Sequence, residues 1–166
     1  SEDNKATNNV KMNGEIAVEA KAKGSVYAIK ADAFSSNTVD GSKNISATTP
    51  SGQAVGIGAQ DGGTNAVNAN ATENLGTLTV STEGGDARGI AAQDSGSTNT
   101  VAGLGAITVS GTTVASGIDA YNGGTNIVNH EGDTDRGDIT VTSTTTSAYG
   151  VSAFTGNGME STDNKV

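Results

Sequence analysis

The sequence predicts an all-β protein, a right-handed parallel β-helix (β-solenoid) of about five three-strand coils of 27–34 residues. Three observations lead to this fold. A three-part phrase recurs five times: Gly-x-[Ile/Leu]-x-Val, then Gly-Ile-x-Ala, then Thr-Asn-x-Val. The copies keep a fixed register, and a repeat period of about 20–50 residues is typical of solenoids. Only 33% of the residues are hydrophobic, which is enough for stacked coils with a thin apolar stripe but not for a globular core.

The first strand of each coil alternates apolar with small polar residues, the pattern of a strand with one buried face. Such strands are predicted at 14–18, 44–47, 76–80, 105–109 and 137–141. With the apolar residues inward, we expect one outward row of small residues. Ice-binding solenoids also carry threonine rows on a flat face, but a second parallel threonine row is not expected here. We therefore interpret the row as an ordinary solvated face. It contains Ala17, Ser46, Thr79, Thr108 and Thr140.

The second and third strands follow in each coil. Second strands are predicted at 28–31, 56–59, 89–92, 117–120 and 150–153. Their anchors, Ile29, Ile57, Ile90, Ile118 and Val151, are separated by 28, 33, 28 and 33 residues, so a 61-residue unit of two coils lies over the single coil. The third strands close on Val39, Val67, Val101, Val128 and Val166.

The longer coils place their extra residues between the third strand and the next first strand. These segments contain 69–74 and 130–135 and are predicted to be loops. Variable loops on a regular scaffold are where binding residues are commonly found. The candidate contact residues in them are Glu73, Glu131, Asp133 and Asp135.

Helices and independent β-hairpins are the competing interpretations. Gly, Ser, Asn and β-branched residues are weak helix formers, and no stretch of 11 residues has a helical apolar stripe. Separate hairpins would need no register between copies. The shared register instead favours like residues stacked at the interstrand spacing of a parallel sheet.

One asparagine stands two residues before the valine that ends each third strand. Asparagine tolerates left-handed backbone at a corner, and its amide can both donate to and accept from the asparagine of the next coil. We predict a structural asparagine ladder rather than a binding site. Its members are Asn8, Asn37, Asn65, Asn99, Asn126 and Asn164.

Turn phrases precede these asparagines, at 61–64, 94–98 and 122–125. Gly supplies positive φ, and Asp or Asn caps the bend. Asp61 and Asp94 fall on neighbouring coils, where they could share a Ca²⁺ ion. The Gly-Gly-x-Gly-x-Asp pattern of calcium-binding repeats is absent from these phrases, so we expect turns without a cofactor.

Composition excludes several classes of function. The chain has no cysteine and thus no disulfide, thiolate metal site or cysteine nucleophile. Its formal net charge of −9 argues against nucleic acid or an anionic membrane surface as the partner, because both need clustered Lys and Arg. No apolar run approaches the roughly 18 residues of a membrane-spanning helix.

Catalytic groups are sparse. Glycoside hydrolysis would need two carboxylates beside a groove, and the acidic residues around Arg136 are the one candidate cluster, which we interpret as a solvated loop. His130, the single histidine, has no serine or cysteine partner at a recognisable position. We expect no enzymatic activity.

Aromatic residues occupy two recurring positions. Tyr27 and Tyr149, with Arg88 in an intervening coil, stand just before the second-strand anchor. Tyr121 and Phe154 are equivalent residues one coil apart, just beyond the second strand. They either pack under the turn or stack into an exposed ridge that can contact a sugar or a protein.

The phrases at 115–120 and 123–128, alternating with 105–109, resemble the passenger repeats of bacterial autotransporters. The resemblance covers nearly the whole chain but rests on repeat style, and nothing matches the family's C-terminal membrane barrel. It implies a secreted, cell-surface β-helix that serves adhesion, aggregation or biofilm formation. The partner would be a surface protein or glycan of host or bacterium, or a second copy of the chain.

We expect residues 1–166 to form one solenoid segment of a longer array, because neither end shows the cap that solenoids use to protect their edges. Two other functions stay open on the sequence alone. The chain could be the subunit of an extracellular filament whose coils stack end to end, or a polysaccharide-active β-helix enzyme.

Overall fold

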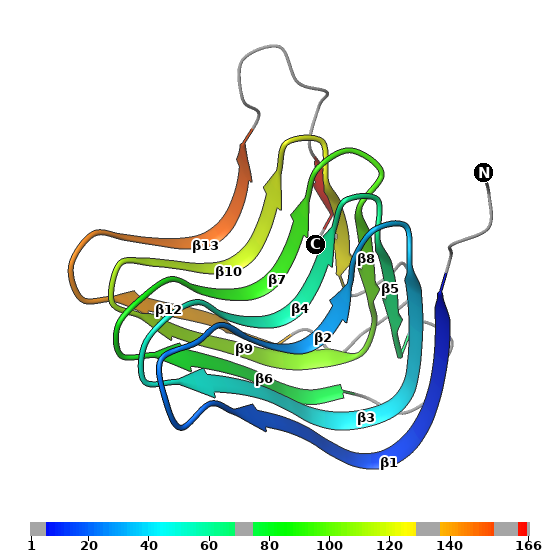
Figure 1. Cartoon of the computed structure of the whole chain (residues 1–166), viewed down its shortest axis with the longest axis horizontal. Helices are drawn as coiled ribbons and strands as arrows, with labels where there is room; N and C mark the ends of the chain where they lie inside the picture. The colour runs from blue at the N-terminus through cyan, green and yellow to red at the C-terminus, as the bar shows by residue number, and fades with distance from the viewer. Residues whose placement is uncertain (1–5, 69–74, 129–136, 155–162, 166) are drawn as a thin grey trace.

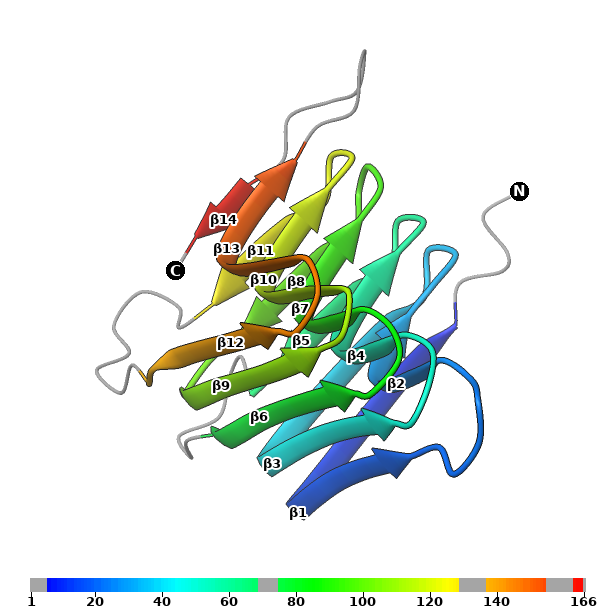
Figure 2. The same ribbon diagram turned by 90° about the vertical axis from the view of Figure 1, so that its left-hand side faces the viewer.

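The computed structural model describes residues 6–68, 75–128, 137–154 and 163–165. In these ranges every regular element is a β-strand, and neighbouring strands of the stack pair in parallel. Successive coils lie one behind another and wind as a right-handed solenoid of about five turns (Figures 1 and 2). The predicted fold class is confirmed.

Each coil contributes a strand to three faces. The first face carries the second halves of β1 (Thr7–Glu19) and β3 (Ser36–Thr49), then β6 (Leu75–Thr82), β9 (Leu104–Gly111) and β12 (Ile139–Ser143). The second face carries β2 (Val26–Ala31), β4 (Ala54–Gln60), β7 (Ala87–Gln93), β10 (Val114–Tyr121) and β13 (Ser147–Phe154). The third face carries the first halves of β1 and β3, then β5 (Thr64–Val67), β8 (Thr98–Val101), β11 (Thr125–Val128) and β14 (Asp163–Lys165).

The corners between the third and first faces differ in length and continuity. Val39 and Ile45 are six positions apart, and β3 runs through this corner as one strand that serves two faces. Val101 and Ile107 are also six positions apart, but there β8 and β9 are separate strands. Val67 and Leu78 are eleven positions apart, and β5 and β6 are separate strands as well.

The core consists of like residues stacked on like residues. Ile57 pairs with Ile29 on one side and with Ile90 on the other, and Ile118 continues the column. Ile57, Ile90 and Ile118 are fully buried. Each such side chain contributes about 1.5–3 kcal/mol relative to an exposed one, so a thin stripe repeated in every coil is sufficient.

In the three middle coils, the glycine before the anchor allows the second face to approach the first. In β4 a Cβ atom on Gly56 would lie 2.6 Å from Cδ1 of Leu78 and 2.7 Å from the carbonyl oxygen of Gly89. The strands of the second face bend, and their concave side faces away from the other two faces (Figure 1). The Gly-Ile phrase is therefore a packing requirement at the bend.

The asparagine side chains form a hydrogen-bonded ladder inside the corner between the second and third faces. Nδ2 of Asn37 donates to Oδ1 of Asn65 at 2.9 Å, and the same contact joins Asn65 to Asn99 and Asn99 to Asn126. Asn8 extends the ladder at 3.0 Å. Asn164 pairs with Asn126 in the backbone register, but its side chain lies outside the described residues.

The outward surface of the first face differs from the expectation of one small-residue row. The predicted row is present, with Ser46, Thr79, Thr108 and Thr140 in register. Two residues farther along each strand, a second hydroxyl row lies beside it, because the alternation continues past the predicted strand ends. Its members are Thr48, Ser81, Ser110 and Thr142.

We expect Asn99→Ala to lower the free energy of unfolding by about 2 kcal/mol or more, since it removes buried hydrogen bonds and leaves their partners unsatisfied. Asn99 is fully buried, accepts from Asn65, and donates to Asn126 and to the Ala91 carbonyl. Urea unfolding followed by circular dichroism measures the change.

Asn8→Ala is the matched control, because Asn8 is exposed at one end of the ladder. This variant should lose less than about 1 kcal/mol. Equal losses in the two variants would contradict a stabilising role of the buried ladder.

Candidate functional site

The acidic loop candidates, Glu73, Glu131, Asp133 and Asp135, lie outside the described residues, as does His130. Asp138, the last residue of the acidic cluster, is described and exposed, and its carbonyl oxygen accepts a hydrogen bond from the Ile107 amide.

The two aromatic candidates at the end of the second face come together. The rings of Tyr121 and Phe154 are stacked, with centroids 5.4 Å apart and an angle of 8° between their planes. Phe154 is 55% exposed. The ridge therefore presents aromatic surface to solvent.

Two glutamines continue this line through the earlier coils. In the parallel register Gln60 pairs with Gln93, Gln93 with Tyr121, and Tyr121 with Phe154. Residues paired in a parallel sheet point to the same side. We call this line the glutamine–aromatic row.

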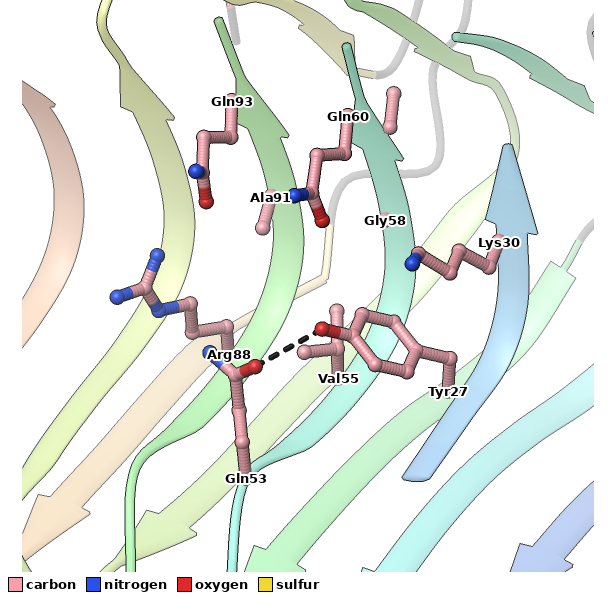
Figure 3. A pocket seen from close by; sticks show the side chains of 10 residues that line it. Tyr27, Lys30, Gln53, Val55, Gly58, Gln60, Arg88, Ala91 and Gln93 are labelled. Carbon is pink, nitrogen blue, oxygen red and sulfur yellow. Dashed lines mark hydrogen bonds between the residues drawn. The ribbon is translucent and has the colours of Figure 1, made fainter. Parts of the chain in front are cut away.

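A depression lies beside the glutamine end of that row, on the outer side of β2, β4 and β7 (Figure 3). Its floor is formed by small residues: Gly58 and Ala91 occupy the position that carries Lys30 in the coil before and Asp119 in the coil after. The depression thus exists because two neighbouring coils lack a long side chain there. Longer side chains surround it, namely Tyr27, Lys30, Gln53, Gln60, Arg88 and Gln93.

Tyr27 lies across the neighbouring coil at the edge of the depression. A Cβ atom on Gly58 would lie 3.2 Å from Cδ1 of Tyr27, so glycine at this position makes room for the ring. The Tyr27 hydroxyl donates to Oε1 of Gln53 at 2.9 Å, which fixes the outer end of the side chain. Val55 is buried beneath this arrangement.

Lys30 lies on one side of the depression, with its Nζ 4.9 Å from the centre of the Tyr27 ring, within the range of a cation–π contact. The ammonium also donates to Oδ2 of Asp32 at 2.6 Å. This hydrogen bond raises the pKa of Lys30 above its usual value, so the side chain is charged at neutral pH.

Arg88 lies on the opposite side and is held from the next coil. Its Nη1 is 3.3 Å from Oδ2 of Asp119, and the Ser152 hydroxyl donates to the other oxygen of that carboxylate at 2.7 Å. Nε of Arg88 is buried and meets no acceptor in the described part of the chain. The guanidinium therefore retains donor capacity.

The size of the depression restricts its ligand. It has room for about 30 Å³, far less than the roughly 300–1,000 Å³ of small-molecule pockets. It is too small to bury a whole ligand of that kind. A shallow hollow beside a row that extends along the stack instead suits a single polar group carried by a longer polymer.

In the sequence, the positions just before the second-strand anchors drew attention to Tyr27, Arg88 and Tyr149. They did not predict the depression that lies between Tyr27 and Arg88. The informative position was the residue after the anchor: Lys30, Gly58, Ala91, Asp119 and Ser152 in the five coils. Comparing this position between coils shows where long side chains are missing, and that comparison was the available signal.

The turn carboxylates form a separate feature at the end of the second face. The carboxylates of Asp94 and Asp32 both repel the carboxylate of Asp61, so the three side chains lie near one another. Among the described residues, no group of three or more acidic or histidine side chains has a geometry that could hold a metal ion. No helix in the described ranges is long and apolar enough to cross a membrane.

Comparison with family models, with curated proteins and with solved structures finds no match to this chain. The site is therefore interpreted from its own geometry.

We expect Asp61→Asn to increase stability at neutral pH. Partial desolvation, followed by repulsion from Asp94 and Asp32, raises the pKa of Asp61 above its usual 3.8. A carboxyl group whose pKa is higher in the folded state favours folding while protonated, and this contribution is lost as the pH rises through the folded-state pKa. Because asparagine does not ionise, the variant does not lose this stability as the pH rises. Asparagine also tolerates the positive φ of 49° at residue Asp61.

Thermal unfolding of both proteins at pH 7 and pH 3 measures the effect. The variant should have the higher Tm at pH 7, and the difference should shrink at pH 3, where Asp61 is protonated in both states. A lower Tm of the variant at pH 7 would show that the carboxylate stabilises the turn.

Proposed function

We propose that this chain is a non-catalytic adhesive segment of a surface protein and that it binds an extended glycan along the outer side of the second face. The observation that carries the proposal is the glutamine–aromatic row beside the depression. Aromatic rings offer flat surfaces to the apolar faces of sugar rings, and amides can donate to and accept from their hydroxyls.

The arrangement favours an extended polymer. Gln60, Gln93, Tyr121 and Phe154 belong to four successive coils, so a ligand that touches all of them runs parallel to the solenoid axis. Contacts spread over several coils also compensate for a depression too shallow to enclose a ligand.

The lining of the depression supports a binding role. Hydrolysis of a glycosidic bond ordinarily uses two carboxyl groups about 5–10 Å apart, whereas the described residues that line the depression include no carboxylate. Lysine, arginine, glutamine and tyrosine are suited to holding a ligand in place.

The resemblance to autotransporter passenger repeats supports the proposed location, a secreted protein on the surface of a bacterium with an outer membrane. In that setting the glycan would belong to a host surface or to a neighbouring bacterium, and its binding would serve adhesion or biofilm formation.

The test is binding of the purified chain to immobilised neutral and acidic polysaccharides, measured by biolayer interferometry. Tyr121→Ala with Phe154→Ala should weaken binding about tenfold or more, because the pair of substitutions removes the apolar contact of two rings and a loss of about 1.4 kcal/mol is tenfold in affinity. Phe34→Ala is the matched control, since Phe34 is 64% exposed but lies in the turn after β2.

The control should bind as the unaltered chain does. Absence of binding to every polysaccharide would refute the proposed function. Unchanged binding by the double variant would show that the aromatic end of the glutamine–aromatic row does not contact the glycan.

A further inference from the structure

We propose that the depression between Lys30 and Arg88 recognises a carboxylate of an acidic polysaccharide. The inference rests on the proposed function and names the class of glycan that the same face would bind. It is carried by the charge, the donor capacity and the shape of the depression.

The charged side chains that line the depression are cations, although the chain as a whole is acidic. Asp and Glu outnumber Lys and Arg by 18 to 9 in the sequence. Nevertheless, the described lining includes two cations, Lys30 and Arg88, and no carboxylate. The Asp32 and Asp119 carboxylates lie outside the lining and are each ion-paired with one of the two cations. The depression therefore favours an anionic acceptor through the unused N–H donors of these cations and not through a net positive charge.

Both cations have donors to spare. Lys30 has three N–H groups, and the described residues provide Asp32 as its hydrogen-bond acceptor. Arg88 contacts Asp119 through Nη1, while its Nε has no acceptor among the described residues and therefore carries the cost of an unsatisfied buried donor. A ligand carboxylate that draws the guanidinium toward the depression would accept hydrogen bonds from Arg88 and Lys30. Hydrogen bonds between two charged partners are stronger than those between neutral ones.

The shape fits the carboxylate of a sugar and not its whole ring. The Tyr27 ring lies beside Gly58, and the hollow that remains near Ala91 can admit a carboxylate between the two cations while the sugar ring stays above it. Gln60 and Gln93 border the same hollow and can bind ring hydroxyls (Figure 3). The carboxylate would thus meet Lys30 or Arg88 while the rest of the chain follows the glutamine–aromatic row.

The net charge of −9 does not prevent this recognition at physiological ionic strength. The Debye length there is about 8 Å, so carboxylates on distant parts of the solenoid are largely screened. The contacts inside the depression lie within that distance and decide the preference.

The experiment uses polygalacturonate, alginate and hyaluronan, each beside its carboxyl-reduced form, in which the carboxylate is a primary alcohol. Binding of the whole chain is measured in 150 mM salt. We expect at least one acidic polymer to bind about tenfold or more tightly than its reduced form, as loss of a charge-assisted hydrogen bond implies.

Lys30→Gln and Arg88→Gln should each weaken binding of that acidic polymer about tenfold and weaken binding of its reduced form much less, because a neutral alcohol loses only an ordinary hydrogen bond. Lys30 is exposed, so its variant remains informative if loss of Arg88 disturbs folding beside Asp119. Lys43→Gln is the matched control, because it makes the same change of charge at an exposed site on β3.

The outcomes separate the two proposals. Equal binding of acidic and reduced polymers, wild-type affinity in both variants, or binding to neutral polysaccharides alone would overturn carboxylate recognition while the proposed glycan binding stands. Failure to bind any acidic, reduced or neutral polysaccharide would overturn both.

Discussion

Three buried asparagines of the ladder, Asn37, Asn65 and Asn99, use their two amide hydrogens differently, and the packing of the coils depends on this division. One hydrogen of Asn65 is donated to Asn99 of the next coil, and the other to the carbonyl oxygen of Gly58 on the second face of its own coil. Asn99 repeats the pattern with Asn126 and Ala91. The ladder therefore fixes the register between coils and the distance between the second and third faces.

The carbonyls bound by the ladder belong to the residues around the depression. The backbone carbonyls of Lys30, Gly58, Ala91 and Asp119 each accept a hydrogen bond from a ladder asparagine, and the first three of these residues line the depression on the outer side. The interior hydrogen bonds thus support the backbone on which the outer surface is built. Preorganisation of this kind reduces the entropy lost when a ligand binds.

The sequence predicted the strands and their register well, because each coil repeats the same physical requirement. Ile57 must match Ile29 and Ile90 in the stack, and this match is visible as spacing in the sequence. It predicted the outer surface less well. The second hydroxyl row beyond Thr79 was missed, since the strand was assumed to end at Val80, whereas β6 continues to Thr82. The depression was missed because it arises where Gly58 and Ala91 carry no long side chain. The equivalent residues of the coils before and after, Lys30 and Asp119, are longer, and this difference is seen only when the coils are compared position by position.

The stacked register also has an evolutionary consequence. Each coil supplies one residue to every outward row, while its inward residues are interchangeable with those of its neighbours. Duplication, deletion or exchange of a whole coil would leave the core intact and change the order of chemical groups along the surface. A lineage could in this way acquire new surface specificities by rearranging coils, without first finding a new fold.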